Sequence, residues 1–498
     1  MTIKRLPGCL VVLMFLASVA FAQAPAGQPG ARAANPSPLN EDRIKHIRVP
    51  ATLYNLAVAY RKSGDIEHLT WTLERLAELL PNSGDTKLAL AALYAGQGEK
   101  SMTYDLLLHM QQQGFGYDLS NDARFAKVAD TKVWDYVVAN LKANLKPFGQ
   151  GRIAFTLPRG DTLLESLAYD PKRHQFLAGS VREGRIYRVG KDGTLETFIT
   201  PGADNGLWSV YGMAADPARD LLWVASTGSV YFKDFRQEDY GKAGLFKFRL
   251  STGKLIDKYL LPADGKPHTL SSVAAGKSGQ VFVADGVRNE IYRLDGDRLK
   301  LLMSNPHLTS LRGMAVSDDG RFLYFADYSL GLFGVDLKAG TGFDLQYDPE
   351  SLVLGGIDGL YWYDHNLIAI ENGMSPPRVM RLGLSDNGRA ITRVMPLDAA
   401  NPQFTLPTYG AIDGDALYFI ANSQKNQYGK YGDPKDESKL QPVRVFRSDL
   451  RFAWNESGAG NKVLPIPVAT PKQREKLLKE KPGAHPVEKQ RDDTGPSH

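Results

Sequence analysis

Six side chains of chemically useful types each stand one residue before a recurring motif. The motifs are SLAYDP, GMAADP, SVAAGK, GMAVSD, GLYWYD and GAIDGD, and the residues before them are Glu165, Tyr211, Ser271, Arg312, Asp358 and Tyr409. Carboxylate oxygens suit a hard cation such as Ca²⁺, whereas a guanidinium suits an anionic group. If these six side chains meet in space, they form a metal site, an anion site or a self-neutralising charge cluster.

The spacing of the motifs predicts how they meet. They recur every 41 to 60 residues, and each is followed by an apolar, β-rich run such as LWVAS or LYFAD. Six units of this length, each opening on a short strand, are typical of a β-propeller. We therefore predict a mainly β fold, with a six-bladed propeller over residues 150–467. Residues 152–157 could supply a strand to the last blade and so close the ring.

The inner strands of a propeller begin near one mouth of the central channel, so the six residues are expected to converge there. The segments LLESLAYDP around Glu165 and GIDGLYW around Asp358 resemble the senescence marker protein / gluconolactonase / luciferin-regenerating enzyme family. The resemblance implies a divalent metal, often calcium, that polarises a lactone or ester. It places metal ligands at Glu165 and Asp358, and a substrate contact near Ser271.

Arg312 departs from that family, which has an asparagine ligand at the blade-four position. An arginine offers only hydrogen-bond donors and a positive charge, which a dication does not accept as a ligand. Three interpretations stay open. Arg312 replaces the metal and bridges Glu165 and Asp358 as a plug; a metal is retained and Arg312 turns toward an anionic substrate; or the site binds a ligand without metal. The cofactor is accordingly either none or calcium.

Two long insertions are expected to overhang the same mouth. They are residues 227–243 in blade two and 422–442 in blade six, which flank blade one around the ring. Loops of this length in compact domains commonly have a function, and aromatic residues among charges are favoured at recognition surfaces. Asn372 and Asn422, at the ends of second strands, could line the mouth as well. The aromatic residues proposed for recognition are Tyr231, Phe232, Phe235, Tyr240, Tyr428 and Tyr431.

A helical domain is predicted before the propeller, over residues 44–147. Small and aromatic residues recur after 34 positions, as Tyr60 and Gly64 do at Tyr94 and Gly98, which resembles the tetratricopeptide repeat. A plain helical hairpin domain is the alternative. Two repeats leave an apolar face uncovered, so a further segment must cap the array or dock it on the propeller. Its apolar residues are Phe125, Val128, Trp134, Val137 and Leu141.

The chain ends indicate export. Residues 1–22 combine Lys4 and Arg5 with an apolar run and the small-residue site Ala20-Phe21-Ala22, a pattern typical of a signal peptide. Residues 23–43 are rich in Ala, Pro and Gly and are predicted to be a linker, and residues 468–498 a disordered charged tail. We expect a periplasmic or secreted protein with no transmembrane span after cleavage of the signal peptide.

The net charge argues against nucleic acid as the partner. The chain has 60 basic and 55 acidic residues, so its formal net charge is only +5, and the basic residues are spread along the chain. Two functions follow from the sequence. The first is a binding module with a degenerate channel site, whose helices and propeller face engage a protein, peptide, glycan or small molecule. The alternative is a calcium-dependent lactonase or esterase. Four histidines without paired spacing, among them His268, give no case for zinc.

Overall fold

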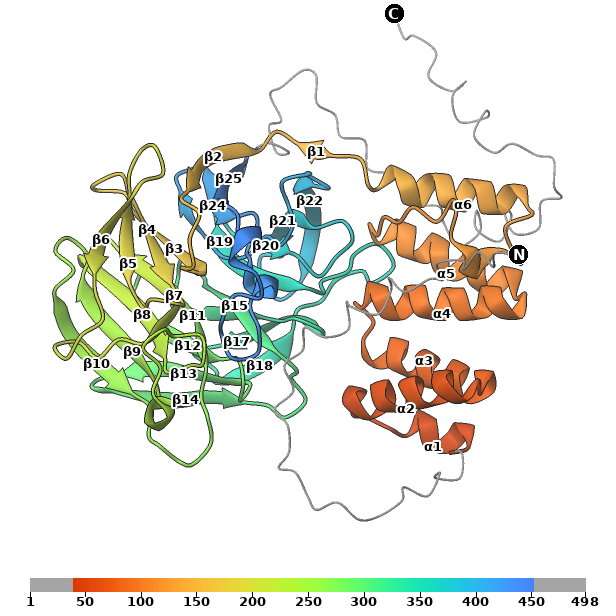
Figure 1. Ribbon diagram of the computed structural model, residues 1–498, viewed down its shortest axis with the longest axis horizontal. Helices are drawn as coiled ribbons and strands as arrows, with labels where there is room; N and C mark the ends of the chain where they lie inside the picture. The colour runs from red at the N-terminus through yellow and green to blue at the C-terminus, as the bar shows by residue number, and fades with distance from the viewer. Residues whose placement is uncertain (1–38, 452–498) are drawn as a thin grey trace, which may run out of the picture.

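The computed structural model describes residues 39–451. The predicted signal peptide (1–22), most of the predicted linker (23–43) and the predicted tail (468–498) lie outside the described residues. Helix α1 (Glu41–Lys45) begins within the stretch predicted as linker, with Asn40 as its N-cap. The helical region and the propeller lie side by side in Figure 1.

Six antiparallel sheets form the propeller, which confirms the predicted six-bladed fold. In each blade the first strand lies innermost. The strands are, blade by blade, β3 (Leu164–Asp170), β4 (Gln175–Ser180), β5 (Ile186–Val189) and β6 (Leu195–Ile199); β7 (Ser209–Asp216), β8 (Leu221–Thr227), β9 (Ala243–Arg249) and β10 (Leu255–Leu260); β11 (Leu270–Ala275), β12 (Val281–Asp285), β13 (Glu290–Asp295) and β14 (Arg298–Ser304); β15 (Leu311–Val316), β16 (Phe322–Asp327), β17 (Gly331–Asp336) and β18 (Thr341–Asp344); β19 (Ile357–Tyr363), β20 (Asn366–Glu371), β21 (Arg378–Leu384) and β22 (Ile391–Ala399); and β23 (Gly410–Asp413), β24 (Ala416–Ile420) and β25 (Val443–Asp449).

The ring is closed by a strand from the start of the propeller. Strand β2 (Arg152–Leu157) pairs with β25, matching Arg152 with Arg447 and Leu157 with Val443. The last blade therefore takes its outer strand from residues 152–157, which covers the edge that β25 would otherwise leave unpaired. Just before it, β1 (Phe148–Gly149) pairs with β22 of blade five.

The second strands of the blades explain why the sequence there reads as continuous apolar runs. Strands β8, β12, β16 and β20 are buried along their whole length. A strand in the middle of a blade is covered on both faces, because neighbouring blades stack against it. The outer strands are exposed or half-buried, as β14 shows. The core of the propeller therefore lies between the blades.

The helical region consists of five further helices. They are α2 (Pro50–Ser63), α3 (Ile66–Leu79), α4 (Gly84–Gln97), α5 (Lys100–Gln112) and α6 (Lys132–Ala143), with a 3₁₀ turn at Ala123–Phe125. Gly64 ends α2 and Gly98 ends α4, with left-handed φ angles of 74° and 87°. Left-handed C-caps favour glycine because it has no Cβ. The 34-residue period thus corresponds to two successive helix pairs, α2–α3 and α4–α5.

The helical region docks on blades four and five. The apolar residues expected either to cap the helices or to dock them do both, because their cluster also contains Val353 and Met374 of the propeller. Arg378 of β21 forms a buried ion pair with Glu371 and donates to the backbone oxygens of Gln113 (3.3 Å) and Val353 (2.9 Å). Apolar packing and buried polar bonds together join the two regions.

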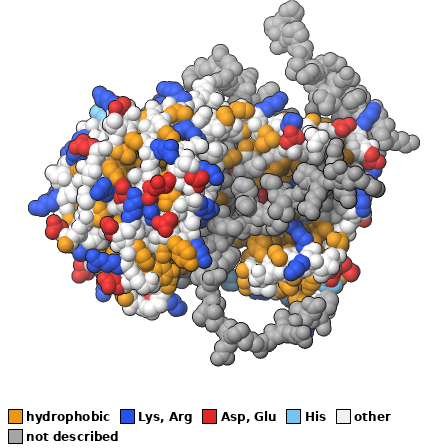
Figure 2. Space-filling model, viewed as in Figure 1, with side chains coloured by type: hydrophobic (Ala, Val, Ile, Leu, Met, Phe, Trp, Pro, Cys, Tyr) orange, Lys and Arg blue, Asp and Glu red, His pale blue; other side chains and the backbone are white. Residues whose placement is uncertain are grey.

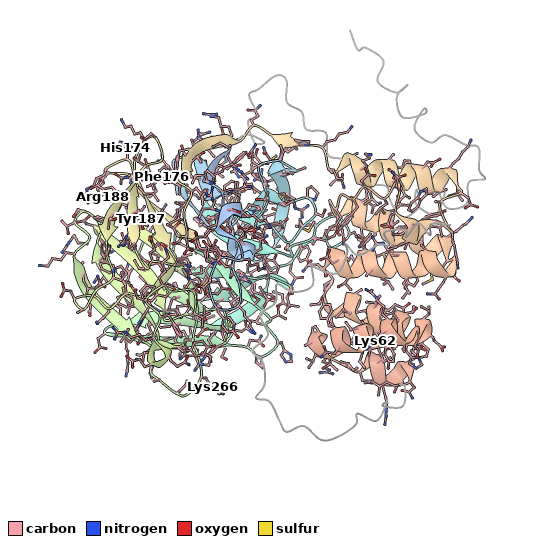
Figure 3. All side chains as sticks on the ribbon, viewed as in Figure 1. Lys62, His174, Phe176, Tyr187, Arg188 and Lys266 are labelled. Atoms are coloured by element: carbon pink, nitrogen blue, oxygen red, sulfur yellow. The ribbon has the colours of Figure 1, made fainter. Side chains whose placement is uncertain are left out.

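The surface carries charges of both signs. On the face in Figure 2, Lys and Arg side chains are interspersed with Asp and Glu side chains over the propeller, as the small net charge predicts. Figure 3 shows Phe176 and Tyr187 in blade one, far from Lys62 of the helical region. Within residues 39–451, no helix is long and apolar enough to cross a membrane.

Candidate functional site

A β-bulge near the start of the inner strand leaves the predicted channel residue unpaired in the ladder in five of the six blades. In blade one, Leu164 pairs with Ser180 and Ser166 with Gly179, so Glu165 between them has no partner across the ladder. The same register shift occurs at Tyr211, Ser271, Arg312 and Asp358. A bulge redirects a side chain out of the regular alternation. The repeated motif thus encodes both an inner strand and a side chain aimed away from the ladder.

The glycines that open several motifs allow neighbouring inner strands to approach closely. A Cβ on Gly313 would lie 2.4 Å from the Leu360 nitrogen and 2.8 Å from the Asp358 carbonyl oxygen. A Cβ on Gly212 would lie 2.8 Å from the Ser271 carbonyl oxygen. Real Cβ atoms do not come so close to backbone, so only glycine fits. This packing brings Arg312 next to Asp358 in the adjacent blade.

Arg312 and Asp358 form an ion pair in the mouth. The Arg312 Nε lies 3.4 Å from the Asp358 Oδ1, and the guanidinium lies over the Tyr328 ring at 5.3 Å. Asn372 donates from Nδ2 to the Asp358 Oδ2 (2.5 Å) and accepts at Oδ1 from the Tyr328 hydroxyl (2.8 Å). The side chains of Arg312 and Asp358 are 29% and 14% exposed, although the Arg312 Nε itself is buried and forms no hydrogen bond among the described residues.

Glu165 has different partners. Its carboxylate accepts a short hydrogen bond from the Ser423 hydroxyl, and its side chain is buried. Burial raises the pKa of Glu165 to about 7, although the nearby charge of Lys425 opposes the rise. No ion pair joins Arg312 to Glu165 among the described residues, so the expectation that Arg312 bridges both carboxylates is wrong for Glu165. Arg312 forms its close ion pair with Asp358, and its charge acts on Glu165 only from a distance.

Lys425 is a second cation in the mouth. It opens a 3₁₀ turn, Lys425–Gln427, in the second insertion, and its side chain reaches solvent. The surrounding protein removes part of its hydration and lowers the pKa of its ammonium; Arg312 lowers it further, while Glu165 and Asp358 raise it. Two cations and two carboxylates therefore share one mouth and act on one another, and Arg312 and Asp358 are the pair in close contact.

The other three predicted residues line the same region. The Tyr211 hydroxyl donates to the Ser229 Oγ at 3.0 Å. The Ser271 hydroxyl is buried with no hydrogen-bond partner among the described residues. Burial raises the pKa of Tyr409, and the charges of Asp358, Arg312 and Glu165 all act on its phenol. Tyr409 is thus close to both carboxylates, and all three side chains add neutral hydrogen-bonding groups.

The two insertions meet beside blade one. Arg182 donates to the Tyr231 carbonyl oxygen (2.8 Å) in the first loop, and its Nη2 lies 3.5 Å from Asp433 in the second. Asp161 holds Arg182 through an Nε–Oδ1 contact of 2.8 Å. The loops also approach each other directly, because a Cβ on Gly432 would lie 2.1 Å from the Val230 carbonyl oxygen. They therefore form one layer, and Ser423 and Lys425 belong to it.

The aromatic residues of these loops divide into two groups. Phe232 and Tyr428 are 7% and 5% exposed, so they hold the loops in place and do not face a partner. Tyr231 and Phe235 are half-buried. Tyr240 and Tyr431 are 53% and 71% exposed and stay candidates for recognition. Sequence could not separate the groups, because burial depends on contacts between the two loops.

Comparisons with known proteins concern the fold. No protein-family model and no curated protein sequence matches the chain significantly. Among solved structures it is similar to a calcium-binding protein, regucalcin, from Agrobacterium tumefaciens (16% identity, TM-score 0.41, covering 60% of this chain and 93% of that one). It is also similar to a gluconolactonase from Xanthomonas campestris (14% identity, TM-score 0.39, covering 61% of this chain and 98% of that one). A third similar structure is the PQQ-bound aldose sugar dehydrogenase of Streptomyces coelicolor (15% identity, TM-score 0.39, covering 61% of this chain and 99% of that one).

These similar structures include a gluconolactonase and a regucalcin, the kinds of protein that the sequence motifs resemble. Identities this low concern the fold alone, and the similar propellers differ in chemistry, so the site must be judged by its own residues.

The mouth does not fit a calcium ion. Calcium takes six to eight oxygen ligands, and Arg312 stands where the sequence resemblance implies a third protein ligand. Its guanidinium stands beside Asp358, and Lys425 adds a second positive charge near Glu165. Asp358 is further occupied by the Asn372 amide, which donates and cannot ligate through nitrogen. The donor set therefore offers two separated carboxylates: Asp358 is paired with Arg312, and Glu165 has a pKa raised by burial to about 7.

Four residues of this site lie outside the repeated motifs. Asn372 follows β20, where a residue lining the mouth is expected, and the structure places its amide on Asp358. Ser423 and Lys425 lie in the 422–442 insertion, which is predicted to overhang Glu165, although the sequence does not single out these two side chains. Tyr328, directly after β16, has no sequence signal of its own. The shared signal is that polar residues just after a second strand point to the mouth.

One group of three potential metal ligands occurs within the described part of the chain: His268, Asp285 and Glu290. The Asp285 carboxylate and the His268 Nδ1 already have partners, whereas the His268 Nε2 is buried without a hydrogen-bond partner among the described residues. The His268 Nδ1 lies 2.7 Å from the Asp285 Oδ2, and the Asp285 Oδ1 accepts from three backbone N–H groups. Asp327 holds the equivalent turn of blade four in the same way. We interpret Asp285 as a structural residue.

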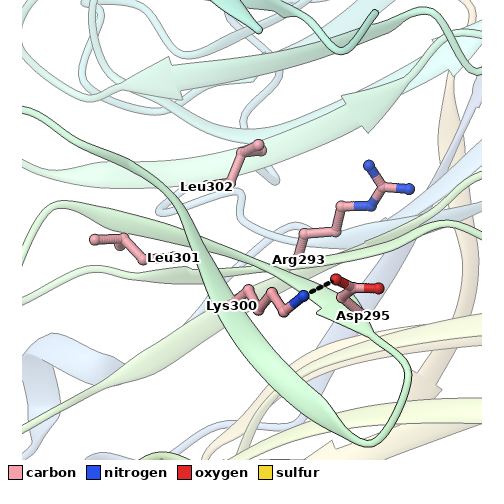
Figure 4. A pocket seen from close by; sticks show the side chains of 5 residues that line it. All are labelled: Arg293, Asp295, Lys300, Leu301 and Leu302. Atoms are coloured by element: carbon pink, nitrogen blue, oxygen red, sulfur yellow. Dashed lines mark hydrogen bonds and ion pairs between the residues drawn. The ribbon is translucent and has the colours of Figure 1, made fainter.

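A shallow hollow lies on the outer strands of blade three (Figure 4). Its charged residues include the Lys300–Asp295 ion pair, whose side chains are about half exposed. Exposed pairs of this kind contribute little to stability. The hollow therefore does not compete with the channel mouth as the candidate site. Its lining residues are Arg293, Asp295, Lys300, Leu301 and Leu302.

Proposed function

We propose that the protein is a ligand-binding module whose channel mouth recognises an anionic group without a metal. The observation that carries the proposal is the Arg312–Asp358 ion pair at the position where the family resemblance implies a metal ligand. Arg312 contacts Asp358 through Nε and lies over the Tyr328 ring, and 29% of its side chain is exposed to an incoming anion. Lys425 supplies a second cation on the loop that covers Glu165.

The site is suited to bind and orient a ligand. A planar guanidinium binds a carboxylate through two parallel hydrogen bonds, and Lys425 adds a point charge that approaches from another side. The Tyr211, Ser271 and Tyr409 hydroxyls provide neutral hydrogen-bonding groups around these charges. Because Arg312 pairs with Asp358 and burial raises the pKa of Glu165 to about 7, an incoming anion meets a mouth without excess negative charge. This arrangement supports recognition more directly than hydrolysis.

Calcium binding separates this proposal from the calcium-dependent lactonase. Isothermal titration of the protein with CaCl₂ should show no binding at the mouth. In the double variant Arg312→Asn/Lys425→Gln, the family's asparagine is restored and both cations are removed, so we expect calcium binding to appear. Calcium binding by the unmodified protein that is lost in Asp358→Ala would contradict the proposal. Turnover of aldonolactones or aryl esters by the same protein would then favour the enzyme.

Anion binding is tested with defined probes. Gluconate and succinate carry carboxylates, and glucose serves as the neutral control in the same titration. We expect binding of at least one carboxylate, weakened about tenfold or more in Arg312→Gln, because a hydrogen bond to a charged group contributes about 1.5–3 kcal/mol. Arg321→Gln is the matched control, since Arg321 is half-exposed and paired with Asp336 away from the mouth. Equal weakening in both variants would contradict a specific role for Arg312.

We further propose that the protein is exported and that its helical region is a tetratricopeptide-like module. The support for export is the composition of residues 1–22, and the support for the module is the 34-residue period of α2–α3 and α4–α5. Amino-terminal sequencing of the mature protein tests export: the expected start follows Ala22. Retention of residues 1–22 would contradict a cleaved signal peptide.

A further inference from the structure

The start of α4 lies beside the channel mouth. Asn82 donates to the Leu330 carbonyl oxygen (2.9 Å) and accepts from the Leu354 backbone N–H (3.3 Å), so the α3–α4 turn is bonded to blade four. Leu330 is two residues from Tyr328, the ring beneath Arg312. The helical region is therefore fixed at the edge of the candidate site.

Asp85 stands in the first turn of α4. Its side chain is exposed, and no ion pair of Asp85 is found among the described residues. It is nevertheless surrounded by protein on one side, since burial raises the pKa of its carboxyl group. An accessible carboxylate held on a rigid turn, beside a mouth that contains two cations, can bind a positive group of a ligand.

Two aromatic rings accompany Asp85. A Cβ on the preceding residue, Gly84, would lie 2.7 Å from the Tyr117 hydroxyl oxygen, so Tyr117 packs against the start of the helix. The charge of Asp85 acts on the phenols of both Tyr117 and Tyr328, and both side chains are half-buried. A carboxylate combined with aromatic faces is a favourable environment for ammonium and guanidinium groups.

We propose that Asp85, Tyr117 and Tyr328 form a subsite for the cationic group of a ligand whose anionic group binds at Arg312 and Lys425. Tyr328 belongs to both parts, because the Arg312 guanidinium lies 5.3 Å from its ring centroid. The inference rests on the proposed anion-binding function and specifies the ligand class: a short peptide with a free carboxyl terminus and a basic side chain. A peptide carries both charges on one chain, whereas a neutral glycan would use neither.

The experiment uses the full mature chain and three sets of synthetic peptides. The first set is acetyl-Lys-(Gly)n with a free carboxyl terminus and one to four glycines, which samples the separation of the two charges. The second replaces lysine by norleucine, and the third amidates the carboxyl terminus. Affinities are measured by titration calorimetry for the unmodified protein, Asp85→Asn and Arg312→Gln. Asp105→Asn, an exposed acidic residue of α5, is the matched control.

We expect the lysine peptide to bind about tenfold more tightly than the norleucine peptide at one linker length. Asp85→Asn should abolish this difference, while Asp105→Asn should preserve it. If lysine and norleucine peptides bind equally but amidation still weakens binding, the cationic subsite is wrong and the anion site stands. If amidation has no effect, the anion site itself is contradicted. If no peptide of any linker length binds, the peptide assignment is overturned.

Discussion

At the scale of single residues, the mouth is defined by how each charge is compensated. Asp358 pairs with Arg312 and accepts a hydrogen bond from the Asn372 amide. Glu165 accepts a hydrogen bond from the Ser423 hydroxyl, and the charge of Lys425 acts on it from farther away. Burial therefore raises the pKa of Glu165 to about 7. Two carboxylates in equivalent positions of one ring differ because their neighbours come from different loops.

The pH dependence of the free energy of unfolding should reveal the ionisation of the Glu165 carboxyl group. Its pKa is higher in the folded protein than in the unfolded chain, so the folded state binds more protons between about pH 4.5 and 7. The free energy of unfolding should fall as pH rises through this window, by about 1 to 3 kcal/mol. In Glu165→Gln this contribution is absent, so the unfolding free energies at pH 5 and pH 8, measured in urea, should lie closer together.

The comparison with Glu165→Gln isolates this residue, because Asp398 also has a raised pKa, about 6, and contributes with the same sign in both proteins. A variant whose unfolding free energy changes with pH as strongly as that of the unmodified protein would show that Glu165 is not held neutral by burial.

At the scale of the strand, the bulge and the glycine act together. The bulge turns Arg312 out of the ladder, and Gly313 lets β15 approach β19 closely enough for the ion pair to form. The motif GMAVSD therefore carries functional information in its first residue as well as in the residue before it. The same logic explains why GMAADP begins with Gly212, next to Ser271 of the following blade.

Gly313→Ala tests this coupling. The added Cβ would collide with the backbone of Leu360 and Asp358, so β15 and β19 must separate. We expect a loss of about 1–3 kcal/mol of stability, typical of overpacking, and a weaker affinity for carboxylate probes. Gly96→Ala is the control, because a Cβ there meets nothing within 4 Å and alanine is favoured within a helix such as α4. Unchanged carboxylate affinity in Gly313→Ala would contradict the coupling.

At the scale of the whole molecule, the helical region and the propeller share a core. Val353 and Met374 pack among the helices, and Arg378 reaches from β21 to the backbone of Gln113. Removal of the Arg378 side chain leaves Glu371 buried without its ion-pair partner, since its exposed fraction is 0%. The two regions are therefore expected to unfold together.

Arg378→Ala should uncouple them. Breaking a buried ion pair by removing one partner costs about 3–5 kcal/mol, because an uncompensated charge stays buried. We expect calorimetry to show one unfolding transition for the unmodified protein and two for the variant, with the helical region melting first. Arg321→Ala should leave a single transition, because Arg321 is half-exposed and its partner Asp336 keeps a second ion pair with Arg389. One transition in Arg378→Ala would indicate that apolar packing alone couples the regions.

The sequence by itself determined the architecture and six positions of the mouth. Apolar runs, turn residues and motif spacing are local properties, and the ring geometry then fixes where each inner strand begins. Glu165 and Arg312 could be named for this reason, as could the closing strand at residues 152–157.

Only the tertiary structure decided how the charges are paired and what surrounds them. Lys425 reaches the mouth from an insertion in which the sequence does not single it out, the Asn372 amide binds Asp358, and Asp85 reaches the edge of the mouth because a separate helical region docks beside it. Burial of Phe232 and exposure of Tyr431 depend likewise on contacts between two loops. Pairing and burial arise from residues far apart in the chain, so no local pattern specifies them.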